Sequence, residues 1–138
     1  MNITTKITGI VVKGRQEGRK IGFPTANITI DHKLNNLNKL KMGIYAGRIR
    51  IKNQWHDTAT YYGKALTYNF DTVVLESHIL DFEDDIYGQQ VELEIVQFIR
   101  PVVKFQSIEE LTNQIILDCK KCKEILQGLS LRSMKQSK

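Results

Sequence analysis

Residues 43–62 read GIYAGRIRIKNQWHDTATYY, and their composition indicates a β-hairpin. Two runs rich in β-branched and aromatic side chains, residues 43–51 and 55–62, lie on either side of a turn at Lys52 and Asn53. Further short runs of strand-forming residues surround this hairpin, at residues 7–12, 26–30, 72–80 and 91–99. The sequence therefore predicts six short strands and a mainly β protein.

One amphipathic helix is expected to follow the strands. Ser107 and Glu110 form a capping box at its start, and Gly128 is expected to end it. Apolar residues recur between them at helical spacing, at positions 108, 111, 115, 119, 122 and 126. Six strands and one helix predict a small closed β-barrel with the helix packed on it. We expect this domain to comprise residues 1–128, and residues 129–138 to form a basic, flexible tail.

Length and composition suit one folded domain, because the chain has 138 residues of which 41% are hydrophobic. No apolar run approaches about 18 residues, so no membrane span is expected. The N-terminus has no signal-peptide pattern, which predicts a cytoplasmic location. Cys119 and Cys122 are too few for a disulfide framework, and their place on the apolar stripe predicts buried structural thiols.

Charge is distributed unevenly along the chain. Residues 1–64 carry 12 basic and 3 acidic side chains (net +9), residues 65–118 carry a net −9, and residues 119–138 carry a net +5. A basic first half favours an anionic ligand, and on charge alone either nucleic acid or phosphate groups would fit.

The basic half contains a glycine-rich segment, GRQEGRKIGFPTAN, at residues 14–27. Its glycines allow the backbone to approach a ligand closely, and Arg15, Arg19 and Lys20 supply positive charge. Thr25 and Asn27 would point to the same side of an extended chain, which suits a magnesium-bound polyphosphate. The segment is not a P-loop, and a solvated hairpin explains the same residues equally well.

Several strand residues could also carry chemistry. Glu76 and His78 share one face of a predicted strand, so Glu76 is a candidate general base, although a solvated outer face explains it as simply. The three histidines are scattered and suggest no metal cluster. Arg100 ends a strand and could reach a ligand or cap the barrel rim. Three aromatic residues could stack on a ring or fill the core: Trp55, Tyr61 and Tyr62.

Taken in order, these segments resemble the riboflavin kinase family, the flavokinase module that also stands at the C-terminal end of bacterial FAD synthetases. The resemblance rests on GIVVKGRQEGRKIGFPTANI, MGIYAG, LESHILDFEDDIYGQQVELEIVQFIRP and FQSIEELTNQIILD, which span residues 9–118. It implies a six-stranded Greek-key barrel with a C-terminal helix, and ATP-dependent phosphorylation of riboflavin to FMN. A monomer with no membrane partner is expected.

The resemblance also implies roles for individual residues. Glu76 matches the catalytic carboxylate that accepts the proton of the ribityl 5′-hydroxyl. Thr25 and Asn27 match the residues that hold Mg²⁺ and the nucleotide phosphates. The other matches are to the phosphate-covering loop (Gly14, Arg19), the region around the nucleotide base (Ile79, Asp81, Tyr87) and the segment that closes over the flavin (Arg100, Phe105).

The chain departs from this family at residues 61–67, YYGKALT, where the family has an Ile-Gly-x-x-Pro-Thr segment that helps to shape the flavin and nucleotide pockets. The nucleotidyltransferase domain of bifunctional FAD synthetases is also missing from the sequence, so the expected product is FMN and not FAD. One alternative stays open: a catalytically weak or inactive flavin-binding regulator that acts on a protein partner, or on RNA through the basic tail.

Overall fold

The computed structural model describes residues 5–12, 24–29, 37, 40–64 and 73–136, with residues 131–136 described without their side chains. Within these ranges, strands precede one helix: β1 (Thr5–Val12), β2 (Ala26–Ile28), β3 (Gly43–Ile51), β4 (Gln54–Lys64), β5 (Val73–Ile79), β6 (Gln90–Pro101) and α2 (Ile108–Gln136). All the strands that the sequence predicts are present, and their ends differ from the expected ones by two residues at most.

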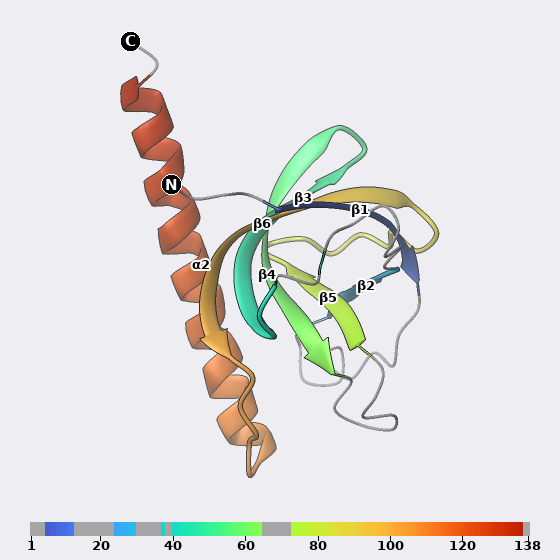
Figure 1. The fold of residues 1–138 in the computed structure, drawn as a ribbon, viewed down its shortest axis with the longest axis vertical. Helices are drawn as coiled ribbons and strands as arrows, with labels where there is room; N and C mark the ends of the chain where they lie inside the picture. Colours follow the sequence, from blue (N-terminus) through green and yellow to red (C-terminus); the bar gives the residue numbers. More distant parts are fainter. Residues whose placement is uncertain (1–4, 13–23, 30–36, 38–39, 65–72, 137–138) are drawn as a thin grey trace.

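The strands form one closed barrel in the order β1-β2-β5-β4-β3-β6, and each neighbouring pair is antiparallel (Figure 1). β3, β4 and β5 follow one another as a meander, and β2 lies beside β5, which gives the order of a Greek key. Closure leaves none of these strands with a free edge. The expected six-stranded Greek-key barrel is confirmed.

The hairpin between β3 and β4 turns where the sequence indicates. Lys52 and Asn53 both have left-handed backbone conformations, with φ of 49° and 67°. Ile51 and Gln54 pair on either side of them. Two successive left-handed residues are typical of a type I′ turn, whose twist matches that of the strands it joins.

Alternate residues of each strand point into the barrel, and most of the interior is filled by large aliphatic side chains. Thr58, Thr60 and Ser77 are also fully buried there, and their hydroxyls form a chain. Thr60 Oγ1 lies 3.0 Å from Thr58 Oγ1 and 2.9 Å from Ser77 Oγ. Because each hydroxyl has a partner, these polar groups are tolerated in the core. The residues that alternate with them, including Tyr61 and Glu76, consequently face outward.

Helix α2 lies along the outside of the barrel (Figure 1). Ser107 caps its first turn as expected, since Ser107 Oγ accepts a hydrogen bond from the Glu110 amide at 3.1 Å. The Glu110 carboxylate reaches one residue further back than in a capping box, because Glu110 Oε2 accepts from the Gln106 amide at 3.0 Å. Further along, Cys122 and Leu126 pack on the barrel wall in a second, smaller apolar cluster. The apolar stripe of the helix therefore meets the outer face of the sheet.

The expectation that the helix ends at Gly128 is wrong, because α2 continues to Gln136. A glycine inside a helix costs only about 1 kcal/mol relative to alanine, and contacts on both sides of it offset that cost. Leu126 is buried, and Arg48 Nη2 donates hydrogen bonds to Leu126 O at 3.2 Å and to Ser130 Oγ at 3.0 Å.

In the described part of the chain, no helix is both long and apolar enough to cross a membrane.

Both cysteines are free thiols on α2. Cys122 is buried, and this burial, together with nearby negative groups, raises its pKa to about 12. Cys119 is partly exposed, and burial again raises its pKa. The expected burial is thus confirmed for Cys122 and is only partial for Cys119.

Candidate active site

A row of side chains crosses five strands on the outer surface of the barrel. Glu76 of β5 lies directly opposite Asn27 of β2 on one side and Tyr61 of β4 on the other. Tyr61 lies opposite Ile44 of β3, which lies opposite Arg100 of β6. Directly opposed residues of antiparallel strands share a face, with Cβ atoms about 4.5–5.5 Å apart. Barrel closure therefore brings Asn27 and Glu76 together from distant parts of the sequence.

Glu76 has the surroundings that a general base needs. Its neighbours Leu75 and Ser77 point into the barrel, and its own side chain is half-buried on the outer face. Burial raises the pKa of the Glu76 carboxyl above its ordinary value. Among the described residues, none donates a hydrogen bond to this carboxylate. A carboxylate that is desolvated and unpaired accepts a proton more readily than a solvated one.

Thr25 and Asn27 carry side-chain oxygen atoms, and Asn27 lies directly opposite Glu76. Asn27 is half-buried on the outer face, because Ala26 and Ile28 on either side of it point into the core. Among the described residues, no hydrogen-bond partner is seen for the side chains of Thr25 and Asn27. Neutral oxygen ligands suit Mg²⁺, which takes its remaining ligands from water and phosphate. The donor set therefore fits a magnesium ion held mainly by a nucleotide.

Two adjoining hollows lie at the end of β5, next to Thr25. The first has a volume of about 180 Å³, and its lining includes Thr25, Ile79 and Tyr87. The second, of about 520 Å³, is lined in part by Ile79 and Asp81. Asp81 has a left-handed backbone with φ of 55°, and its carboxylate lies 3.1 Å from Lys123 Nζ of α2. The residues predicted to surround the nucleotide base are thus brought together in the fold.

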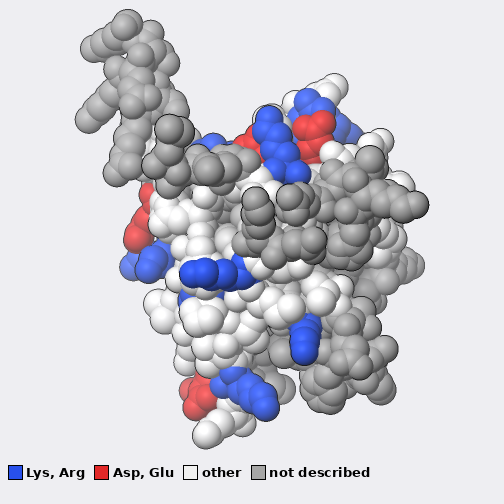
Figure 2. All heavy atoms as spheres, viewed as in Figure 1, with Lys and Arg blue, Asp and Glu red and all other residues white. Residues whose placement is uncertain are grey.

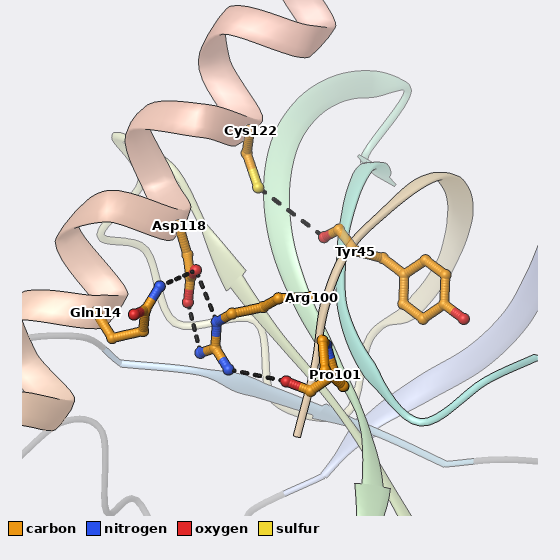
Figure 3. Close-up of polar contacts among 6 residues, drawn as sticks. All are labelled: Tyr45, Arg100, Pro101, Gln114, Asp118 and Cys122. Carbon is orange, nitrogen blue, oxygen red and sulfur yellow. Dashed lines mark hydrogen bonds and ion pairs between the residues drawn. The ribbon is translucent and has the colours of Figure 1, made fainter. Parts of the chain in front are cut away.

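Arg100 does not project freely from the barrel rim, because it is bound to α2 (Figure 3). Its Nε and Nη2 donate to the two carboxylate oxygens of Asp118 at 2.9 and 2.7 Å, and Gln114 Nε2 donates to Asp118 at 3.0 Å. The guanidinium also lies over the ring of Phe105, 5.7 Å from its centre. The predicted contact of Arg100 and Phe105 with a flavin stays a prediction, and the observed contact of Arg100 with Asp118 joins the helix to the barrel.

Two of the predicted site residues, Gly14 and Arg19, lie outside the described residues. Sequence reasoning missed Asp118, although one signal was present: an acidic residue lies beside the apolar stripe of a helix, one turn after Gln114 and one turn before Cys122. A carboxylate at such a position is buried and needs a partner from the barrel. The direct pairing of Tyr61 with Glu76 had no sequence signal, since it depends on the register between β4 and β5.

Comparison with known proteins relates the chain to one family. The family model described as riboflavin kinase (flavokinase) matches residues 1–126. The chain is 39% identical over 119 residues to the bifunctional riboflavin kinase/FMN adenylyltransferase of Haemophilus influenzae, covering 86% of this chain and 37% of that protein. It is 40% identical over 115 residues to the RNA-binding riboflavin kinase RibR of Bacillus subtilis, covering 83% of this chain and 48% of that protein.

A solved structure shows the same architecture. The riboflavin kinase of Trypanosoma brucei superposes with a TM-score of 0.71 at 24% identity, covering 99% of this chain and 87% of that structure. The chain spans less than half the length of the two curated relatives named above, but the family model covers nearly all of the chain. The protein therefore belongs to the riboflavin kinase family.

Proposed function

We propose that this protein transfers the γ-phosphoryl group of MgATP to the 5′-hydroxyl of riboflavin and releases FMN and ADP. The observation that carries the proposal is the pairing of Asn27 with Glu76 across β2 and β5, next to the hollow that Thr25 lines. This pairing brings side-chain oxygens that could bind the metal and the phosphates close to a carboxylate of raised pKa. Family membership supports the same substrates.

Glu76 is proposed to accept the proton of the ribityl 5′-hydroxyl as its oxygen attacks the γ-phosphorus. The new O5′–P bond forms while the bond between the γ-phosphorus and the bridging oxygen of ADP breaks. A primary alcohol is a poor nucleophile, so removal of its proton and in-line alignment carry much of the catalysis. The elevated pKa of Glu76 suits this role, because it brings the carboxyl nearer to neutral pH.

Thr25 and Asn27 are proposed to hold the magnesium ion and the nucleotide phosphates. Bound there, the ion would screen the negative charge of the β- and γ-phosphates during attack. The hollow formed by Ile79, Tyr87 and their neighbours would receive the nucleotide base, as the family resemblance implies. Its lining is mostly apolar, which suits a flat heterocyclic ring.

The test is direct assay of the purified protein with riboflavin, ATP and MgCl₂. FMN that alkaline phosphatase converts back to riboflavin is expected, and EDTA is expected to prevent its formation.

Glu76→Gln is expected to lower kcat by about 10²–10⁴-fold while ADP affinity changes by less than about threefold. Glu92→Gln is a matched control, since Glu92 is another strand glutamate, paired with Arg50 away from the row. Normal turnover by Glu76→Gln would exclude it as the base.

A non-catalytic regulator remains the second reading, and a named relative is an RNA-binding riboflavin kinase. The charge distribution on one face of the molecule does not favour it. On the face shown in Figure 2, lysine and arginine side chains are scattered, and several lie beside acidic ones. Arg50, for example, lies 2.6 Å from Glu92, and Arg48 lies 3.7 Å from Asp57. Riboflavin binding without FMN formation, together with salt-dependent RNA binding, would support this second reading.

A further inference from the structure

In the row of outward-facing residues, Glu76 has a neighbour on each side, and phosphoryl transfer needs the nucleotide on one side of the reacting group and the alcohol on the other. The attacking oxygen and the leaving oxygen lie roughly in line on opposite sides of the γ-phosphoryl group. Glu76 has Asn27 of β2 on one side and Tyr61 of β4 on the other. Thr25, just before β2, lines the hollow, so the β2 side is the nucleotide side. The alcohol must then reach Glu76 from the β4 side, where Tyr61 lies.

The side chain of Tyr61 is held along its own strand. A Cβ atom added at Gly63 would lie 2.8 Å from Tyr61 Oη and 3.0 Å from Tyr61 Cζ, so the far end of the ring covers this glycine. Tyr61 Oη donates a hydrogen bond to Lys64 O at 2.7 Å. The same Cβ would lie 3.4 Å from Val102 Cγ2, so Val102 also lies close to Gly63. Tyr61 therefore presents a fixed aromatic surface one strand away from Glu76.

Two charged groups of the row act on this ring: Glu76, directly beside it on β5, and Arg100, at the β6 end of the row. Partial burial raises the pKa of Tyr61, the Glu76 carboxylate raises it further, and the Arg100 guanidinium lowers it. Arg100 is held by Asp118 and so is not free to cover the ring. Tyr61 is half-buried, which leaves part of the aromatic surface open to a ligand.

We propose that Tyr61 is a specificity-determining residue on the acceptor side, where its ring stacks on the isoalloxazine of riboflavin while the ribityl chain extends to Glu76. This inference rests on the proposed kinase function. Riboflavin carries its reactive hydroxyl at the end of a flexible chain, so recognition of the flat ring must come from a group some distance from the base. A fixed aromatic surface at the neighbouring strand meets that need, since flat heterocycles stack favourably on aromatic side chains.

Other described aromatic residues are less suited to this task. Tyr62 points into the core. The ring of Phe105 lies under the Arg100 guanidinium. Tyr87 lines the hollow on the nucleotide side. Trp55 is exposed and lies next to the β3–β4 turn, beside Arg50.

The experiment follows the fluorescence of riboflavin as it is titrated with the intact protein. A stacked phenol quenches an excited flavin by passing it an electron, which then returns, so the wild-type complex is expected to be dim. Tyr61→Phe keeps a ring but is a much weaker electron donor, so the bound flavin is expected to become bright while Kd stays within about threefold. Tyr61→Leu removes the stacking surface and is expected to raise the riboflavin Kd about tenfold, with ATP KM unchanged.

Two further variants separate stacking from general disruption. Gly63→Ala keeps Tyr61 but displaces the end of its ring, so it is expected to weaken riboflavin binding and brighten the bound flavin. Trp55→Phe, on the same strand, is expected to change neither. Wild-type affinity and quenching in both Tyr61 variants would overturn the inference even if the protein makes FMN. A wild-type protein that neither binds riboflavin nor makes FMN would overturn the proposed function as well.

Discussion

Removing the Asp118 carboxylate should lower the free energy of unfolding by about 3 kcal/mol, because it breaks a buried ion pair between α2 and the barrel. The Arg100 and Asp118 side chains are only 17% and 4% exposed, and the carboxylate accepts two hydrogen bonds from the guanidinium and one from Gln114. Breaking a buried ion pair by removing one partner costs roughly 3–5 kcal/mol. Because Arg100 is not fully buried and can regain some water, the expected cost of Asp118→Ala lies at the lower end of this range.

For a chain of 138 residues, an unfolding entropy of roughly 2.1 cal/mol/K per residue converts that cost into a Tm about 10 °C lower. Urea unfolding followed by far-ultraviolet circular dichroism measures it directly. The double variant Arg100→Met/Asp118→Leu removes both charges and is expected to recover most of the loss, since apolar replacement of a buried pair is often neutral.

Lys123→Gln is the matched control on the same helix. It breaks only the exposed pair with Asp81, whose side chains are 46% and 80% exposed, and is expected to cost less than about 0.5 kcal/mol. A cost below about 1 kcal/mol for Asp118→Ala, or a double variant no more stable than the single one, would refute the assignment of this pair as the anchor of α2.

The kcat/KM for riboflavin should fall as the pH is lowered, with an apparent pKa above the ordinary glutamate value, because burial raises the pKa of Glu76. A kcat/KM that stays constant down to the ordinary glutamate pKa would contradict this prediction. Glu76→Gln should be more stable than the wild type at pH 7. The pKa of Glu76 is higher in the folded than in the unfolded protein, so the wild type loses stability as the pH rises and Glu76 ionises, whereas glutamine stays neutral. The difference in stability should vanish as the pH falls below the unfolded-state pKa of Glu76. Equal urea midpoints at pH 7 would argue against a desolvated carboxylate. Gly128→Ala should raise stability by about 1 kcal/mol, because nothing lies within 4 Å of the added Cβ and the residue is inside α2; a loss of stability would mean that the helix is interrupted there.

Local chemistry accounts for the features that could be predicted. The left-handed pair Lys52 and Asn53 forms a turn from two residues alone. The hydrogen bond from the Glu110 amide to Ser107 Oγ, which caps the helix, forms within one helical turn. Glu76 is a candidate from its place on a strand face, Thr25 and Asn27 are candidates from the glycine-rich segment, and the family resemblance supports all three. These signals act over a few residues, so they can be recognised before the partners of each segment are known.

Long-range contacts account for the rest. Alternation within a strand tells which face a residue occupies, but the position of Tyr61 beside Glu76 comes from the register between strands. The same holds for Arg100, whose pairing with Asp118 requires α2 to pack at one place on the barrel. The continuation of α2 past Gly128 also depends on the contacts of Leu126 and Arg48, which outweigh a weak local preference.

Amino-acid order alone specifies that this protein has six short strands, a capped helix and a glycine-rich segment before Thr25 and Asn27, because backbone propensity and side-chain alternation are local. Three-dimensional closure of the barrel puts Asn27 beside Glu76 and takes water away from the Glu76 carboxyl. Desolvation depends on everything packed around a group and not on its neighbours in sequence. The raised pKa of Glu76, and the aromatic surface of Tyr61 next to it, are therefore properties of the folded barrel.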